Sequence, residues 1–228
     1  MVKIGLFCEG ISESKILTHI IEKYLGCDNV VVNPLQPKQE NGKQQGFGGW
    51  HEVLLRCNDD DVNDVFATND YLVIQIDSDM SHPDGYKAIT DEEEKQGIDD
   101  ETHYAKIVNR LESNLSLEVV EKYRGKIIFA ICFNETECWL IPLYYENDPK
   151  KCCSTTNCIY ILNQGLPDKI GYIPDKDKNS PAAIATYRAI LKNLKAKNIP
   201  VVAQYNYGFQ RFIEQLDVIK ASLPNQQG

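Results

Sequence analysis

Three pairs of acidic residues each follow a short apolar run of the sequence, where their side chains could bind a metal ion together. The pairs are Glu9 with Glu13, Asp77 with Asp79, and Glu135 with Glu137. Residues two apart in an extended chain point the same way, and residues four apart in a helix share a face. Carboxylate oxygens suit Mg2+ or Mn2+, and such ions can orient a water and stabilise the charge of a phosphorane. The pairs therefore predict a metal site for phosphodiester hydrolysis.

Each pair also has an ordinary structural explanation. Glu13 would lie in the first turn of a helix, where the helix dipole favours an acid. Asp-Ser-Asp after a strand is a common turn composition, and a glutamate such as Glu135 or Glu137 is unremarkable at a helix start. The occurrence of all three pairs behind buried strands favours the metal site.

Hydrophobic periodicity predicts the elements that must position these residues. Strands are expected at 3–8, 29–33, 71–76, 126–133 and, shortest of all, 199–204. Helices are expected at 12–25 with Ser12 as N-cap, and at 50–67, 101–115, 135–145, 181–197 and 209–223. The segments 34–49 and 78–100 are predicted to be loops, the second of them a long loop or lid.

Strands that alternate with helices predict an α/β fold with a mainly parallel sheet flanked by helices and carrying helical additions. In such a sheet the ends of the strands meet at one edge, which is where sites form. We interpret residues 1–228 as a single domain, with a core of about 1–145 and a C-terminal α/β extension of about 146–228.

The composition, 43% hydrophobic and 25% charged residues, is that of a globular protein. The net charge of −9 argues against bulk attraction to nucleic acid, although bound divalent cations would offset part of it. Local basic stretches remain, at Lys150, Lys151, Lys192, Lys195 and Lys197.

No apolar stretch approaches the length needed to cross a bilayer, and no secretory signal is recognisable, so a cytoplasmic protein is expected. Its eight cysteines are therefore expected to be reduced thiols. The cluster at 152–158 lacks the paired spacing of a zinc site.

Several segments resemble known motifs. FCEGISESKIL resembles the first motif of TOPRIM domains, and IQIDSDM resembles their Asp-x-Asp motif. NETECWLIP, GGWHEVL and YNYGFQRFIEQL resemble landmarks of small stand-alone bacterial TOPRIM-like proteins of unknown function, which are related to OLD-type nucleases. The resemblance implies a Rossmann-like (TOPRIM) fold and metal-dependent phosphodiester chemistry on DNA or RNA.

Carried over residue by residue, the resemblance makes Glu9 a metal ligand and acid or base, and Asp77 and Asp79 catalytic metal ligands. Glu13 would be the additional ligand of OLD-like sites, and Glu137 or Glu135 would complete a second metal position. Ser81 stands where the longer family pattern often has another acid, which leaves the number of metals open. The association of such families with defence systems suggests a nuclease that acts against phage.

Two other functions are compatible with the sequence. Asp-x-Asp after a buried strand also begins the site of haloacid-dehalogenase-like phosphatases, in which the first aspartate, here Asp77, is a nucleophile. The chain could instead be a non-catalytic metal-binding partner of a separate ATPase, since it contains no phosphate-binding loop of its own.

Overall fold

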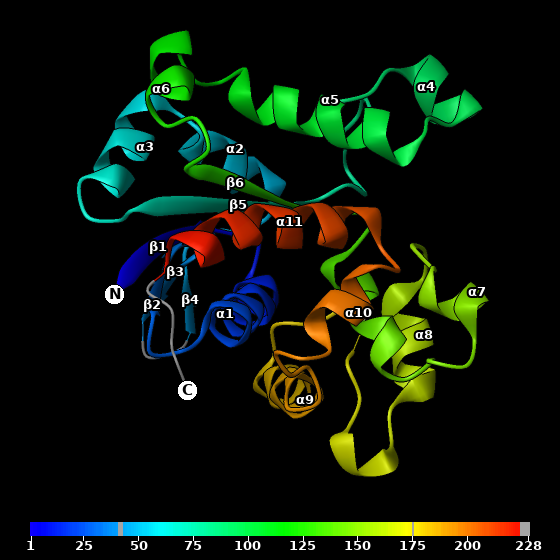
Figure 1. Ribbon diagram of the computed structural model, residues 1–228. Helices are drawn as coiled ribbons and strands as arrows, with labels where there is room; N and C mark the ends of the chain where they lie inside the picture. Colours follow the sequence, from blue (N-terminus) through cyan, green and yellow to red (C-terminus); the bar gives the residue numbers. More distant parts are fainter. Residues whose placement is uncertain (41–42, 175, 224–228) are drawn as a thin grey trace.

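A parallel β-sheet forms the centre of the computed structural model, which describes residues 1–40, 43–174 and 176–223 (Figure 1). The sheet has four strands in the order β2-β1-β5-β6. They are β1 (Val2–Phe7), β2 (Val30–Gln36), β5 (Tyr71–Asp77) and β6 (Ile127–Cys132). The α/β class and the parallel sheet predicted from the alternating pattern are confirmed.

The two strands β5 and β6 are buried along almost their whole lengths, as their continuous apolar sequences predicted. Their register pairs Asp77 with Cys132, so both strands end at the same level. Phe7 at the end of β1 pairs with Ile74 of β5. Residues that follow β1, β5 and β6 therefore leave the sheet at one common edge.

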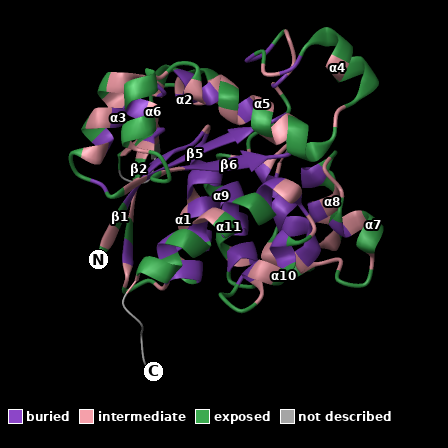
Figure 2. Cartoon of the chain, turned by 45° about the horizontal axis from the view of Figure 1, so that its top comes forward, coloured by how far each residue is buried: buried purple, intermediate pink, exposed green. Residues whose placement is uncertain are grey.

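Helices cover both faces of the sheet, because side chains along each strand alternate between two separate apolar cores (Figure 2). The larger core lies under α1 (Ile11–Leu25), η1 (Thr136–Leu143), α8 (Cys158–Gly165), α9 (Pro181–Leu191), α10 (Ile199–Ala203) and α11 (Tyr207–Ser222). The smaller core lies under α2 (Trp50–Arg56), α3 (Asp59–Phe66), α5 (Asp100–Glu112) and α6 (Leu117–Lys122).

Both predicted loops contain short regular elements. The segment 34–49 includes the end of β2 and an antiparallel hairpin of β3 (Lys38–Glu40) and β4 (Lys43–Gln45), although residues 41 and 42 lie outside the described residues. The segment 78–100 includes α4 (Asp91–Gln96), which begins with a complete capping box. Short helical turns α7 (Pro149–Cys152) and η2 (Asp168–Ile170) complete the C-terminal part.

Three predicted helices differ in detail. The predicted helix 50–67 is two helices, because Asn58 accepts a hydrogen bond from the backbone N–H of Asp61 and caps a new helix there. The first predicted helix starts one residue earlier, at Ile11, and Ser12 is not its N-cap. The segment 135–145 forms a 3-10 helix, which contains Pro142.

The predicted strand 199–204 is wrong, because its residues form the helix α10. Ile199 and Val202 are buried there against the larger core, so packing overrides the strand preference of the β-branched residues. The described residues after Asp148 contain helices and no strand, which corrects the α/β character expected for the extension.

Cys138 and Cys158 form a disulfide, which corrects the prediction that all cysteines are thiols. The bond joins η1 to α8. Cys8, Cys57 and Cys132 are buried thiols, whereas Cys27, which also lies in or beside an apolar pattern of the sequence, is exposed. Among the described residues, no helix combines the length and apolar character that crossing a membrane requires.

An aromatic stack fixes η1 to the last helix. The ring of Trp139 stacks on Phe209 with centroids 4.4 Å apart, and its centroid is 5.7 Å from that of Phe212. Its Nε1 donates a hydrogen bond to Asn206 Oδ1 at 3.1 Å. Because Trp139 is two residues from Glu137, this stack also positions an acid of the predicted site.

Phe212→Ala should lower the free energy of unfolding by about 3–5 kcal/mol, because the side chain is fully buried and its loss leaves a cavity under η1. Chemical denaturation monitored by circular dichroism measures this change. Phe47→Ala is the matched control, since Phe47 is 83% exposed and should matter by no more than about 0.5 kcal/mol. Equal losses in the two variants would contradict the assignment of this core.

Candidate functional site

Glu9 is held at the common edge by hydrogen bonds to β5. Its backbone N–H donates to Gln75 Oε1 at 3.0 Å, and its Oε1 accepts the backbone N–H of Asp77 at 2.7 Å. The side chain is only partly buried, so Glu9 is the least enclosed acid among the residues gathered here.

Glu13 lies in the first turn of α1 and is 1% exposed. Its Oε2 accepts a hydrogen bond from Ser12 Oγ at 2.8 Å. A Cβ atom at Gly10 would lie 2.4 Å from the same oxygen, so the Glu-Gly turn requires glycine for the carboxylate to fold back over it. The spacing of four between Glu9 and Glu13 thus brings both acids to one side of the turn.

Asp77 is the last residue of β5 and is 4% exposed. Its Oδ1 accepts hydrogen bonds from Gln75 Nε2 and Thr136 Oγ1, both at 2.8 Å. Tyr86 donates its hydroxyl to the backbone carbonyl of Asp77 at 2.9 Å. Both the side chain and the backbone of Asp77 are therefore fixed.

Glu137 enters the same place from η1 and is fully buried. Its Oε1 accepts a short hydrogen bond from the Tyr187 hydroxyl of α9. Its Oε2 is buried with no hydrogen-bond partner among the described residues. A buried carboxylate oxygen without a hydrogen bond is costly unless a cation lies near it, and Lys178 Nζ lies 3.7 Å from this one.

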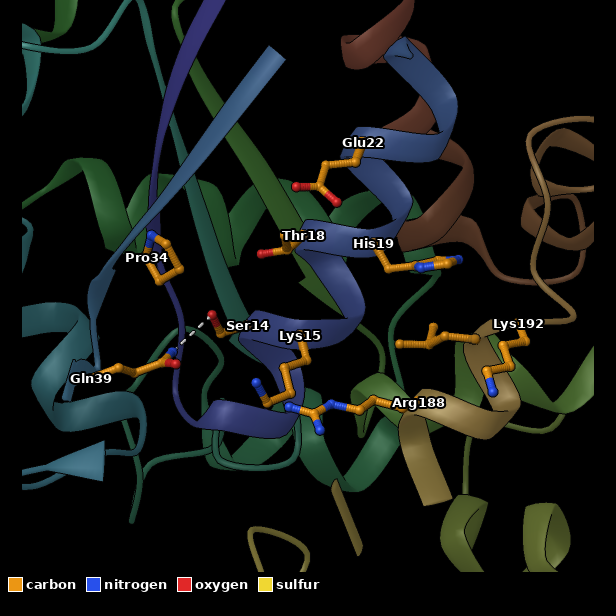
Figure 3. A pocket seen from close by; sticks show the side chains of 10 residues that line it. Ser14, Lys15, Thr18, His19, Glu22, Pro34, Gln39, Arg188 and Lys192 are labelled. Atoms are coloured by element: carbon orange, nitrogen blue, oxygen red, sulfur yellow. Dashed lines mark hydrogen bonds between the residues drawn. The ribbon is translucent and has the colours of Figure 1, made fainter. Parts of the chain in front are cut away.

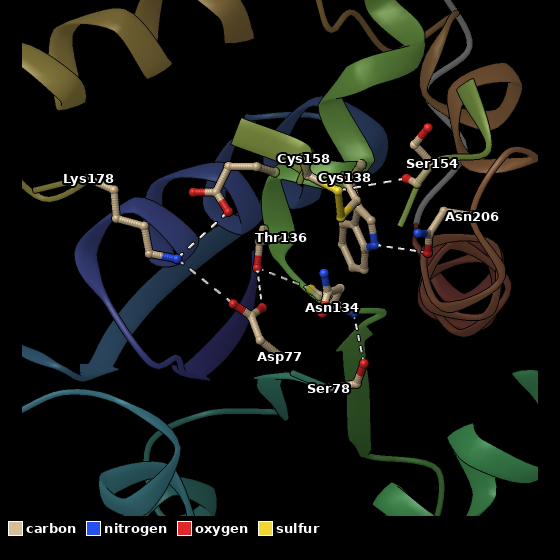
Figure 4. Close-up of a disulfide and its surroundings, with 12 residues drawn as sticks. Asp77, Ser78, Asn134, Thr136, Cys138, Ser154, Cys158, Lys178 and Asn206 are labelled. Carbon is tan, nitrogen blue, oxygen red and sulfur yellow. Dashed lines mark hydrogen bonds and ion pairs between the residues drawn. A yellow bond between two sulfur atoms is a disulfide. The ribbon is translucent and has the colours of Figure 1, made fainter. Parts of the chain in front are cut away.

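Lys178 points its ammonium towards Asp77 (Figure 4). Its Nζ lies 2.7 Å from Glu13 Oε1, 3.7 Å from Glu137 Oε2 and 3.9 Å from Asp77 Oδ2. The neighbouring Asn179 accepts hydrogen bonds from the backbone N–H and the hydroxyl of Ser12, both at 3.1 Å, and so fixes this loop to the start of α1. We call Glu9, Glu13, Asp77 and Glu137 the acidic cluster and Lys178 its central cation.

The pKa values reflect crowding of like charges in a buried place. Burial and the charge of Glu9 raise the pKa of Asp77. Burial would also raise the pKa of Glu13, but the Lys178 ammonium lowers it below its usual value. Burial would lower the pKa of Lys178, yet Glu13, Glu137 and Asp77 raise it. Lys178 is therefore a permanent positive charge among the acids.

The remaining two predicted ligands lie farther out. Asp79 is exposed at the rim, close enough for its charge to raise the pKa of Glu9, and it lines a cavity of about 340 Å3 with His82 and His103. Glu135 precedes η1 and lines a different cavity of about 390 Å3 with Tyr160. The structure thus gathers Glu9, Glu13, Asp77 and Glu137, with Asp79 beside them.

Sequence reasoning did not identify Gln75, Thr136, Lys178 or Tyr187. Gln75 is a polar residue inside an otherwise apolar strand, which is a usable signal, since a buried amide needs partners. Lys178 carries no such signal, because it lies about a hundred residues beyond Asp77 in a polar loop.

The donor set fits a hard divalent cation, because every charged donor is a carboxylate. Among the described residues, however, no three His, Cys, Asp or Glu side chains are already arranged as a complete metal site. The distances to Lys178 give the reason, since the ammonium lies between the carboxylates of Glu13, Asp77 and Glu137. Three or more of these acids would share a metal only if Lys178 moved aside.

Comparison of the chain with models of protein families, with curated proteins and with solved structures finds no match in any of the three.

Glu9→Gln should remove a pH-dependent loss of stability. Burial, together with the charges of Glu13 and Asp79, raises the pKa of Glu9 from 4.5 to about 8 in the folded protein. Protonated Glu9 therefore makes its full contribution to the free energy of unfolding below pH 4.5. This contribution is lost as the pH rises towards 8. In EDTA, the melting temperature of the variant should rise progressively relative to that of the parent over this interval.

Glu118→Gln is the control, because Glu118 is exposed on α6, away from the acidic cluster. Its melting temperature should differ from that of the parent by the same amount at every pH. A difference between Glu9→Gln and the parent that does not change with pH would show that Glu9 ionises freely in the folded protein.

Proposed function

We propose that this protein is a metal-dependent nuclease of the TOPRIM type that hydrolyses phosphodiester bonds of nucleic acid. The observation that carries the proposal is the convergence of four carboxyl groups at the strand edge. They come from three separate segments, and Lys178 lies within 4 Å of three of them, those of Glu13, Asp77 and Glu137. A divalent cation is the simplest supplement to Lys178, because it adds two positive charges and binds oxygen ligands.

Glu9, Asp77 and Asp79 are the residues proposed to hold Mg2+ or Mn2+ at the open side of the cluster, with Glu13 and Glu137 behind them. The metal would lower the pKa of a bound water and neutralise charge on the phosphate. Glu9 retains one carboxylate oxygen that makes no hydrogen bond within the described residues, and this oxygen is suited to accept a proton from the attacking water.

Lys178 would stabilise the additional negative charge that develops on the phosphate, since its ammonium is permanently charged and its side chain is 27% exposed. Gln75 holds Glu9 and Asp77 in place. Its amide accepts a hydrogen bond from the backbone N–H of Glu9 and donates one to the carboxylate of Asp77. Tyr187 holds Glu137 from α9.

The phosphatase alternative requires Asp77 to attack phosphorus with a carboxylate oxygen. In this structure Oδ1 accepts two hydrogen bonds and Oδ2 lies 3.9 Å from Lys178 Nζ, so both oxygens already have polar neighbours. In the other alternative, a non-catalytic metal-binding partner of a separate ATPase, the same acids would bind the metal. It differs from the nuclease proposal in that this chain would not cleave nucleic acid by itself.

Asp77→Asn and Glu9→Gln should each lower the rate of Mn2+-dependent cleavage by about 100-fold or more, since even the loss of a residue that only hydrogen-bonds to a metal ligand costs about 10–100-fold. The assay incubates the full chain with labelled single- and double-stranded DNA and RNA, with Mn2+ or with EDTA. Asp60→Asn is the matched control, because Asp60 is exposed on α3 and should leave the rate unchanged.

Cleavage by the parent that survives in both site variants would refute the proposal. A stable phosphoryl group on Asp77 after incubation with a phosphate monoester would favour the phosphatase instead. Calorimetric Mn2+ binding that depends on Asp77, with cleavage only after an ATPase is added, would favour the partner role.

A further inference from the structure

A basic groove is lined by residues of α1 and α9, together with Pro34 of β2 and Gln39 of β3 (Figure 3). It has a volume of about 330 Å3. We call it the α1–α9 groove, and its charged and imidazole-bearing lining residues are Lys15, His19, Glu22, Arg188 and Lys192. The net charge of the protein is −9, so a local gathering of cations is unexpected on composition alone.

The cations of the groove have no acidic partners. Among the described residues, neither Lys15, Arg188 nor Lys192 forms an ion pair, whereas Lys178, Arg56 and Lys106 do. Figure 3 shows Lys15 on α1 and Arg188 on α9 directed into the same space. Burial and the charge of Arg188 lower the pKa of Lys15, so the two cations repel one another. An anion between them would relieve this repulsion.

The groove and the acidic cluster are built on neighbouring segments of the chain. Ser14, which lines the groove, directly follows Glu13, and its hydroxyl accepts a hydrogen bond from Gln39 at 3.3 Å. The helix α9 starts three residues after Lys178. At the other end, the ring of His19 is hydrogen-bonded to the carbonyl of Leu194 at 2.8 Å.

The cations of the groove are spread along a helical turn. Arg188 of α9 and Lys192, the C-cap of that helix, lie four residues apart, which corresponds to about 6 Å along the helix, and Lys15 faces them from α1. A row of cations over this length suits a chain of phosphates better than a single anion.

We propose that the α1–α9 groove binds the sugar-phosphate backbone of a single strand of nucleic acid and leads it to the acidic cluster. This inference rests on the proposed function for the identity of its ligand. Lys15 and Arg188 contact successive phosphates, and Lys192 adds a further positive charge at the outer end. Because the lining offers cations and no Phe, Tyr or Trp ring for stacking, binding is insensitive to base sequence.

The test is the affinity of the full chain for a fluorescein-labelled 20-nucleotide oligothymidylate, measured by fluorescence anisotropy in EDTA so that no cleavage occurs. Lys15→Gln/Arg188→Gln should weaken binding about tenfold or more, since each charge-assisted contact contributes substantially. The slope of log affinity against log salt should become shallower by about 1.4, or about 0.7 for each lost phosphate contact on a single strand.

Lys95→Gln/Lys169→Gln is the matched control. It removes the same charge from two exposed lysines that do not line the groove. If both double variants bind equally well, or if the parent binds no oligonucleotide at low salt, the groove proposal is wrong. Displacement of the oligonucleotide by inorganic phosphate at equal ionic strength and equal phosphate concentration would likewise overturn it in favour of a small-anion site.

Cleavage assays separate this inference from the proposed function. Cleavage by the parent that is unaffected in Lys15→Gln/Arg188→Gln, together with unchanged binding, would reject the groove and leave the nuclease in place. Groove-dependent binding without cleavage in Mg2+ or Mn2+ would keep the groove and reject the nuclease.

Discussion

The arrangement of this site depends on carboxylates buried together around a single ammonium. Such a group is unfavourable unless each charge is paired or hydrogen-bonded, because burial removes the solvent that would otherwise stabilise the ions. Lys178 meets this requirement for Glu13 and, at longer distance, for Asp77 and Glu137. Glu9 lies outside its direct reach, and the buried Oε2 of Glu137 has no hydrogen bond within the described residues. The fold therefore maintains a place where additional positive charge is favourable.

The sheet makes this crowding possible by supplying rigid supports on several sides. Parallel strands end at one level, so the acids after β1, β5 and β6 cannot avoid one another. Gln75 links two of these strands through its amide, bonding to the backbone of Glu9 and to the carboxylate of Asp77. Behind η1, the stack of Trp139 on Phe209 prevents Glu137 from withdrawing. Packing thus opposes the repulsion between the charges.

The parts predicted correctly from sequence are those that depend on local pattern. Continuous apolar runs identified β5 and β6. Lys178 was missed because its role depends on a loop folding back over the sheet edge from a distant part of the chain. The strand predicted at 199–204 failed for a related reason, since its β-branched residues satisfy a helical core instead.

The acidic and basic side chains gather in different places, which bears on the argument that a net charge of −9 opposes binding to nucleic acid. A net charge averages over the surface, whereas a polyanion responds to the potential along its own path. Here acids are concentrated at the strand edge, whereas the α1–α9 groove is lined by cations that form no ion pair within the described residues. The two features share supporting elements, since α1 presents Glu13 and α9 starts three residues after Lys178. Under the proposed function, the groove would offer a phosphate chain a positive route towards a metal held by the acids.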